Sequence, residues 1–192
     1  ADLSNKDRLQ SIANKIQKEI VYADIPSQVL ESIKEHYYAL NVSSDESLKD
    51  VLKNEQGPFV AVRASPVGYT DSTKVHLNFL NIQGEERLTK AVLTAWASFF
   101  TAKAIAFRHE NGVQKASIAV VIQSMVNPTQ SGIVYSTNPT NHEETLILAC
   151  RGLGTAIVTG AAIPDRYKVR KTDAYVEDID IKKQTVLYQR DI

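Results

Sequence analysis

Residues 59–65 read FVAVRAS, and the sequence changes there from helical to strand-rich character. A short apolar run bounded by polar sequence is typical of a buried strand. Arg63 is therefore expected where a rigid strand ends. A polar loop is expected to follow over residues 64–74, and alternating apolar residues predict a second strand over residues 75–79.

Upstream of this run the sequence predicts helices. Apolar residues recur at three- and four-residue spacing over 9–20 and again over 29–40, which places each set on one helix face. Ser4 is the expected N-cap of the first helix. Pro26 suits the first turn of the second helix, and Asp45 is expected to cap a short third one.

Downstream, one long helix is expected over residues 84–108, ended by Asn111 and a glycine. Strands are then expected at 117–126, 132–135, 145–150 and 156–159, with weaker ones at 167–170 and 185–188. Helices followed by a run of strands predict an α+β fold. We expect one domain with a helical N-terminal segment, residues 1–56, and a core, residues 57–192.

Composition excludes several functions. Lys+Arg and Asp+Glu both number 22, so no global field favours nucleic acid or an anionic membrane. No apolar run approaches the ~20 residues of a membrane span, and the polar N-terminus is not a signal peptide. The single cysteine, Cys150, forms no internal disulfide and is expected to be a small buried hydrophobe. This cysteine usage fits a cytoplasmic protein. The four histidines are scattered and predict no metal site.

Three segments could carry chemistry. The guanidinium of Arg63 offers a fixed fork of donors to a phosphate, unless it is merely exposed or paired with a carboxylate. Residues 119–126, AVVIQSMV, could line an apolar slot for an adenine, with Met125 as a soft filler, unless they form a core strand. Residues 152–155, GLGT, could direct backbone N–H groups at an anion, unless they form a tight turn.

Five segments, in order, resemble motifs of the pyruvate phosphate dikinase and phosphoenolpyruvate synthase family. VAVRAS at 60–65 is similar to VAVRSS, and residues 95–108 look like the family's tryptophan helix. Residues 120–126 resemble VVVQxMV. SGIVYSTNP at 131–139 resembles SGVxFTxNP, and residues 152–165 resemble GLGExVVxG followed by PD. Each motif alone is weak, but five in order with near-family spacing are specific.

The resemblance implies an ATP-grasp fold in which antiparallel or mixed sheets surround a nucleotide cleft. It implies ATP and Mg²⁺ as ligands, with Arg63 on the phosphates and Gln123, Met125 and Val126 at the adenine-side hinge. The implied partners are a phosphohistidine domain and a pyruvate-binding domain of a larger protein. No catalytic residue is expected in this chain, because the family's lysine loop and metal-binding glutamate fall outside the matched segment.

Three departures keep other functions open. The loop after Arg63 is shorter than in the family and carries only Gly68, Ala64 replaces the usual second serine, and Thr155 replaces the glutamate of GLGE. The leading hypothesis is an ATP-binding segment of a phosphotransferase. The alternatives are a non-catalytic nucleotide-binding or interaction module, the ATP domain of a rifampin-type phosphotransferase, and a globular domain unrelated to nucleotides.

Overall fold

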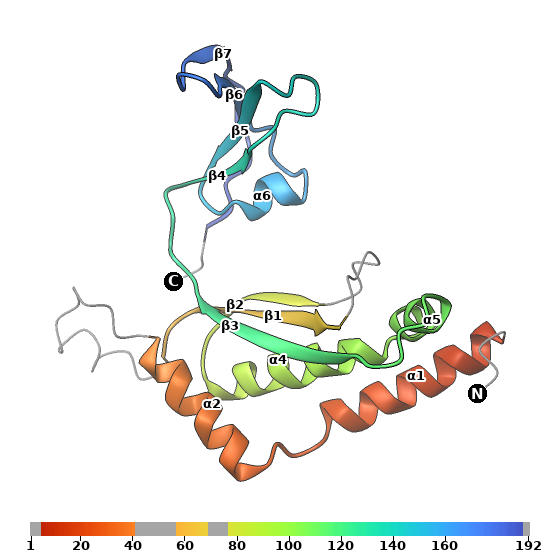
Figure 1. The fold of residues 1–192 in the computed structure, drawn as a ribbon. Coiled ribbons are helices and arrows are strands. Elements are labelled where there is room, and N and C mark those ends of the chain that lie inside the picture. The colour runs from red at the N-terminus through yellow and green to blue at the C-terminus, as the bar shows by residue number, and fades with distance from the viewer. Residues whose placement is uncertain (1–4, 41–56, 69–76, 190–192) are drawn as a thin grey trace. The chain divides into compact units, whose positions relative to one another are not determined.

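The computed structural model describes residues 5–40, 57–68 and 77–189. The chain forms two compact units, unit 1 from Ala1 to Met125 and unit 2 from Val126 to Ile192 (Figure 1). The predicted helical segment thus shares unit 1 with the first sheet. The helix expected from Asp45 lies outside the described residues.

The described helices of unit 1 begin and end at local signals. Asn5 is the N-cap of the first helix, and its Oδ1 accepts a hydrogen bond from the Arg8 N–H at 3.0 Å. Pro26 is the N-cap of the second helix. The helix therefore begins one residue later than expected, because Pro26 was predicted to lie in its first turn. No described helix is long and apolar enough to cross a membrane. The elements are α1 (Lys6–Val21), α2 (Ser27–Ala39), α4 (Glu85–Ala97), the 3₁₀ turn η1 (Ser98–Phe100) and α5 (Ala102–Glu110).

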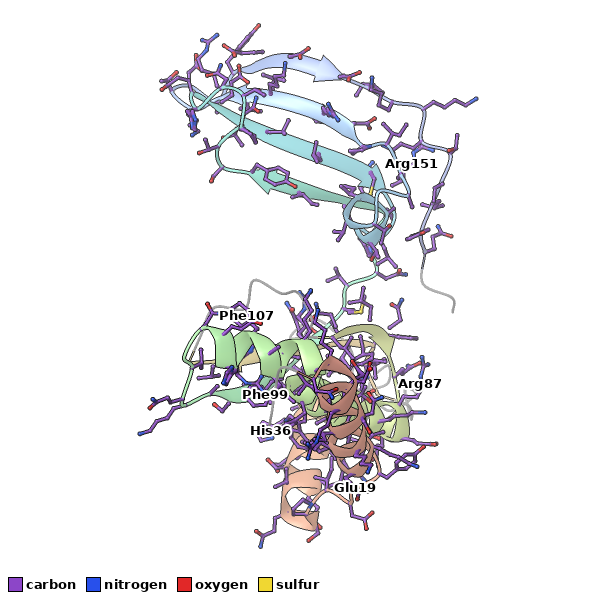
Figure 2. The ribbon with its side chains drawn as sticks, turned by 90° about the vertical axis from the view of Figure 1, so that its right-hand side faces the viewer. Glu19, His36, Arg87, Phe99, Phe107 and Arg151 are labelled. Carbon is purple, nitrogen blue, oxygen red and sulfur yellow. The ribbon has the colours of Figure 1, made fainter. Side chains whose placement is uncertain are left out.

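The prediction of a single helix over 84–108 is wrong, because the helix is interrupted at Thr101. This residue is extended, with φ −62° and ψ 146°, and its Oγ1 accepts a hydrogen bond from the Ala104 N–H at 3.2 Å. The new helix, α5, brings the guanidinium of Arg108 to 3.8 Å from the ring centroid of Phe99, which is labelled in Figure 2. A local N-cap and this cation–π contact therefore redirect the chain.

Unit 1 contains a three-stranded antiparallel sheet in the order β2-β1-β3. The strands are β1 (Val60–Val67), β2 (Asn78–Ile82) and β3 (Ser117–Ser124). The loop expected from Ala64 onward is thus partly wrong, because β1 continues to Val67, and Arg63 lies within the strand and not at its end. The Ala64 N–H donates to Leu77 O on the β2 side. The nitrogen of Pro66 faces the same side, and no described residue of β2 lies opposite it.

The core of unit 1 lies between α4 and one face of this sheet (Figure 1). Val60 and Val62 of β1 point toward α4 and are fully buried. Tyr37 of α2 fixes the edge of this core. Its hydroxyl donates to Pro58 O at 2.8 Å and accepts from the Gly84 N–H at 2.9 Å. One buried side chain thereby joins α2 to the starts of β1 and α4.

Unit 2 contains a four-stranded antiparallel sheet in the order β4-β5-β6-β7. The predicted strand at 156–159 is wrong, because α6 (Thr155–Val158) occupies it and packs on β5. The strand expected at 185–188 is also absent, and Tyr188 forms only an isolated bridge with Gly152. The four strands of the unit 2 sheet are β4 (Gln130–Tyr135), β5 (Glu144–Arg151), β6 (Asp165–Arg170) and β7 (Val176–Asp180).

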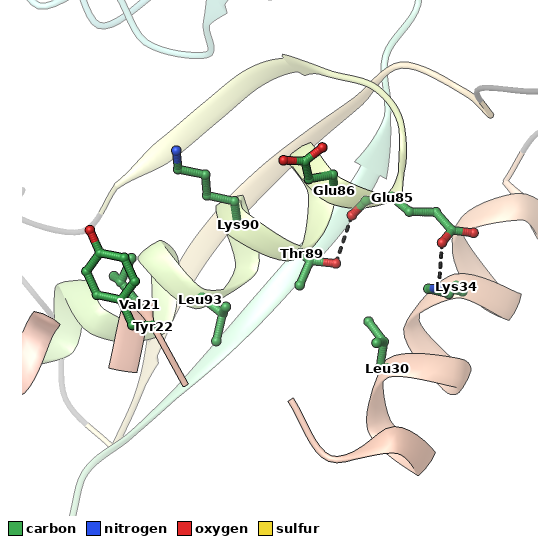
Figure 3. Close-up of a pocket in the computed structure, with 9 residues that line it drawn as sticks. All are labelled: Val21, Tyr22, Leu30, Lys34, Glu85, Glu86, Thr89, Lys90 and Leu93. Atoms are coloured by element: carbon green, nitrogen blue, oxygen red, sulfur yellow. Dashed lines mark hydrogen bonds and ion pairs between the residues drawn. The ribbon is translucent and has the colours of Figure 1, made fainter. Parts of the chain in front are cut away.

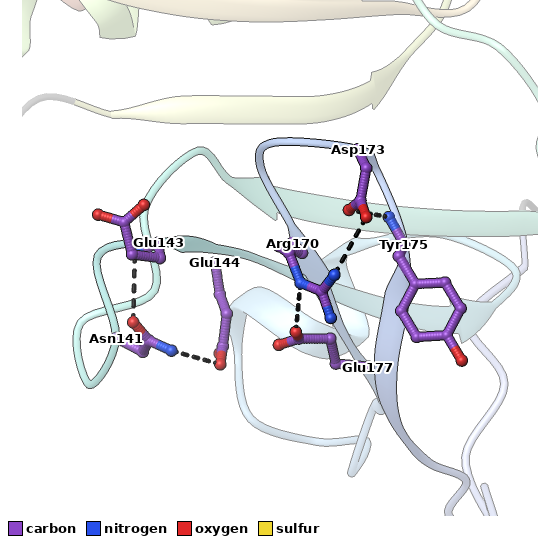
Figure 4. A network of polar contacts seen from close by, with 7 residues as sticks. All are labelled: Asn141, Glu143, Glu144, Arg170, Asp173, Tyr175 and Glu177. Carbon is purple, nitrogen blue, oxygen red and sulfur yellow. Dashed lines mark hydrogen bonds and ion pairs between the residues drawn. The ribbon is translucent and has the colours of Figure 1, made fainter.

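Strand β7 was not predicted, because its sequence, VEDID, is polar and most of the strand is exposed. Backbone pairing with β6 and side-chain contacts hold it in place. Arg170 of β6 donates from Nε to Glu177 Oε1 at 2.6 Å and from Nη1 to Asp173 Oδ2 at 3.0 Å (Figure 4). Its guanidinium also lies 5.4 Å from the ring centroid of Tyr175. These exposed contacts fix the β6–β7 turn.

Candidate functional site

The strand register brings Arg63 and Gln123 to one face of the unit 1 sheet. Ala61 of β1 pairs with Gln123 of β3, and Arg63 pairs with Val121. Directly paired residues share a face, and so do residues two apart along a strand. The Arg63 and Gln123 side chains are therefore diagonal neighbours. We call this surface, formed by Ala61, Arg63, Asn78, Val121 and Gln123, the open face.

The open face lies opposite the face that packs on α4. Val60, Val62, Val120 and Ile122 alternate with its residues along β1 and β3, and they belong to the core. Arg63, Gln123 and Asn78 are exposed and Val121 is 47% exposed, whereas Ala61, the fifth residue of this face, is 2% exposed. The sequence alternative that residues 119–126 form a simple core strand thus holds for only one of the two faces of β3.

Arg63 lies on the central strand of this sheet. No described residue forms an ion pair or hydrogen bond with its side chain, so the carboxylate-paired alternative finds no support within the described ranges. The open face also presents no carboxylate among the described residues of its three strands. A guanidinium that is held on a rigid strand, with no anion beside it among the described residues, retains its attraction for a phosphate.

Met125 and Val126 follow the end of β3, where the two units meet in sequence. The Met125 N–H donates to Phe59 O at 2.8 Å, and the Met125 sulfur accepts a hydrogen bond from the Asn81 N–H at 3.2 Å. Val126 is 79% exposed and is the first residue of unit 2. The end of β3 is therefore fastened to both β1 and β2 immediately before the chain enters unit 2.

Sequence reasoning missed two asparagines of β2 beside these residues. Asn78 pairs with Arg63 on the open face. Asn81 has a left-handed φ of 56°, and its Oδ1 is buried without a hydrogen-bond partner in the described structure. Asparagine tolerates this conformation better than most residues. An asparagine in a strand pattern could have signalled the irregularity at Asn81, but only the register reveals Asn78.

The glycine segment at 152–155 behaves as a turn. The Gly152 N–H donates to Thr129 O at 2.8 Å, and the Leu153 N–H donates to Tyr188 O at 2.8 Å. These two amides are used within the chain and do not face an anion. Thr155 begins the single turn of α6. The turn alternative is thus supported at Gly152 and Leu153.

Cys150 lies in the core of unit 2, as expected. It is 3% exposed and packs with Ala156 and Ala162. Burial, and secondarily the Asp165 carboxylate, raise the pKa of its thiol above the usual value. A buried thiol with a raised pKa is a poor nucleophile. Among the described residues, no three His, Cys, Asp or Glu side chains are grouped to hold a metal ion.

A separate groove of about 610 Å³ lies between the end of α1, α2 and α4, and it contains none of the predicted site residues (Figure 3). Of the four charged residues that line it, Lys34, Glu85, Glu86 and Lys90, two form an ion pair. Lys34 forms an ion pair with Glu85, which also accepts from the Tyr38 hydroxyl at 3.1 Å. The hydrogen bond from Lys34 lowers the pKa of Glu85, and the same bond raises the pKa of Lys34. This pairing indicates a structural contact between α2 and α4.

Comparison with known proteins identifies the family of this chain. Residues 1–191 match the family described as pyruvate phosphate dikinase, AMP/ATP-binding domain. A rifampicin phosphotransferase of Bacillus cereus is 32% identical over 98% of this chain and 21% of its own length. A phosphoenolpyruvate synthase of Pyrococcus furiosus is 30% identical over 98% of this chain and 23% of its own.

A probable phosphoenolpyruvate synthase of Methanocaldococcus jannaschii is 29% identical over 99% of this chain and 16% of its own length. The chain thus spans about a fifth of the length of these relatives. The family match covers almost the whole chain, including every residue of the open face. The chain belongs to the pyruvate phosphate dikinase AMP/ATP-binding domain family.

Proposed function

We propose that this chain is the ATP-binding part of a larger phosphotransferase and that the nucleotide binds on the open face. The observation that carries the proposal is the register that places Arg63 and Gln123 diagonally on one exposed sheet face. Arg63 would bind the phosphates. Gln123, Met125 and Val126 would border the adenine at and just beyond the end of β3, as in an ATP-grasp fold.

The described strands of the open face contain no carboxylate, so they do not fit a protein-bound Mg²⁺ site. We therefore propose that Mg²⁺ arrives with ATP, coordinated by the phosphates. Phosphoryl transfer depends on positioning and charge stabilisation more than on covalent chemistry. The role proposed for this chain is accordingly to hold and orient the triphosphate.

The proposed reaction of the larger protein is transfer of a phosphoryl group from ATP to a histidine on a separate domain, which would then serve a final acceptor. The names of the relatives support two acceptor classes, pyruvate and a rifamycin. Thr155, where the family motif has glutamate, favours a second candidate, a nucleotide-binding module without catalysis. Formation of AMP from Mg·ATP by the larger protein would support the first; binding without turnover would support the second.

Substitution of Arg63 tests the binding site. Arg63→Ala should weaken ATP binding by about 1–3 kcal/mol, the cost of losing a charged hydrogen bond. The measurement is a titration of the 192-residue chain with Mg·ATP, followed by NMR so that weak binding is still quantified. Arg87→Ala is the matched control, because Arg87 is an exposed arginine of α4 (Figure 2). Equal affinity of the Arg63→Ala and parent chains would refute the site.

A further inference from the structure

A pocket of about 450 Å³ lies wholly within unit 2, whereas every residue of the open face belongs to unit 1. The register of the unit 2 sheet fixes its floor. Tyr135 pairs with Leu146, which pairs with Lys168, and Leu148 pairs with Arg166. These five residues, all of which line the pocket, share one face of the sheet, because paired residues and residues two apart along a strand point the same way.

The turn between β4 and β5 forms a wall of this pocket. Asn138 lines the pocket and is 4% exposed, and it donates from Nδ2 to Glu144 Oε2 at 2.7 Å. Its Oδ1 accepts from the N–H and the hydroxyl of Thr140, at 3.2 and 3.0 Å. Asn141 donates to the other carboxylate oxygen, Glu144 Oε1, at 2.6 Å (Figure 4). These bonds hold the wall in place without a ligand, which lowers the free-energy cost of binding one.

The two charged residues that line the pocket are both cationic, and only one of them is paired. Lys168 forms an ion pair with Asp178 at 2.8 Å. Asp180, which lies opposite Arg166 on β7, pairs instead with Lys182 at 2.7 Å. Arg166 is exposed, and among the described residues its side chain has no ion-pair or hydrogen-bond partner. Its guanidinium therefore offers a planar fork of donors that matches a carboxylate.

We propose that this pocket binds a small organic monoanion, a carboxylate with a compact apolar body. The apolar body packs on Leu146 and Leu148 beside the ring of Tyr135, and the carboxylate pairs with Arg166. Ligand pockets are commonly apolar with a few polar groups that fix the orientation of the ligand. One unpaired cation favours a single negative charge. The inference does not depend on the proposed ATP site.

Three probes separate the contribution of the charge from that of the apolar body. Benzoate has both, benzyl alcohol has the ring without the charge, and acetate has the charge without the ring. Titrations of the 192-residue chain, followed by NMR of the leucine methyl groups, measure binding of each. Benzoate should shift the signals of Leu146 and Leu148 and bind about tenfold more tightly than either other probe.

Arg166→Gln removes the charge and keeps most of the side chain, so it should weaken benzoate binding about tenfold or more. Arg151→Gln is the matched control, because Arg151 is an exposed arginine on the opposite face of the same sheet (Figure 2). This control should bind benzoate within about twofold of the parent chain, since exposed charges far from the ligand are screened. Circular dichroism confirms that each variant is folded.

Preferential binding of benzoate, lost in Arg166→Gln and kept in Arg151→Gln, supports the inference. It is overturned if benzoate leaves both leucine signals unmoved, if benzyl alcohol or acetate binds equally well, or if the two arginine variants bind benzoate alike. Arg63→Ala should bind benzoate like the parent. A loss of benzoate affinity in Arg63→Ala would assign the anion to the open face and overturn this inference, without contradicting the proposed function.

Discussion

At the scale of single residues, a buried hydroxyl that is hydrogen-bonded to a strand start and a helix start contributes to the stability of unit 1. Tyr37 is 1% exposed, and its hydroxyl is hydrogen-bonded to Pro58 O and to the Gly84 N–H. The ring also fills the space beside Gly57, where an added Cβ would lie 2.6 Å from Tyr37 Cε1. Sequence periodicity identifies Tyr37 as a core position of α2 but does not predict either hydrogen bond, because both partners are distant in sequence.

We expect Tyr37→Phe to destabilise unit 1 by about 1–3 kcal/mol, because it leaves a buried carbonyl and an N–H without their partner. Urea unfolding followed by Trp96 fluorescence measures the change. Tyr38→Phe is the matched control, because Tyr38 is 37% exposed and its hydroxyl donates a hydrogen bond only to the exposed carboxylate of Glu85. The control should change stability by no more than about 0.5 kcal/mol. Equal effects of the two variants would contradict this account.

At the scale of elements, local propensity and tertiary contact compete. The apolar pattern from 84 to 108 is continuous, yet the helix is interrupted at Thr101, where the chain is extended. The strand expected at 156–159 has apolar residues that suit either structure, and the observed α6 buries Ala156 fully beside Cys150. The sequence pattern identifies Ala156 and most apolar residues of α4 as buried, but Val158 is 75% exposed, and neither backbone conformation was predicted.

Substitution of Gly152 tests how much the turn between β5 and α6 contributes to the stability of unit 2. Its φ is +71°, and a Cβ there would collide with the backbone oxygen of Tyr188. We expect Gly152→Ala to destabilise unit 2 by at least about 2 kcal/mol, from the left-handed backbone and the collision together. Thermal unfolding followed by circular dichroism is the measurement.

Gly160→Ala is the matched control for this prediction. Gly160 has nearly the same φ, +72°, but nothing lies within 4 Å of the position of its Cβ. Its substitution should cost roughly 1–2 kcal/mol, the backbone term alone. Equal destabilisation by the two substitutions would show that the contact with Tyr188 contributes nothing.

At the scale of the whole molecule, the chain has two separate described cores. One contains Val60, Val62 and Tyr37 with residues of α4, and the other contains Cys150, Ala156 and Ala162. The division falls between Met125 and Val126, two of the residues proposed to border the adenine. Residues 1–56 and 57–192 remain the sequence-based division, and in the structure α1 and α2 belong to the unit that contains the first sheet.

Independent cores imply independent responses to substitution. Trp96 is the single tryptophan of the chain and packs in unit 1, so its fluorescence reports unfolding of that unit. We expect Gly152→Ala to leave the urea midpoint of Trp96 fluorescence unchanged and Tyr37→Phe to lower it. A midpoint that falls equally in both variants would show that the units unfold as one.

The sequence by itself determined the elements and chemistry that depend on local order: most helices and strands, the buried state of Cys150, and the family, because five motifs occur in order. Only the tertiary structure decided which residues share a face. Pairing of β1 with both β2 and β3 places Asn78, Arg63 and Val121 in one row, although Val121 comes 58 positions after Arg63 in the sequence. Register depends on interactions between distant strands, and shifting it by one residue would turn Arg63 toward the core.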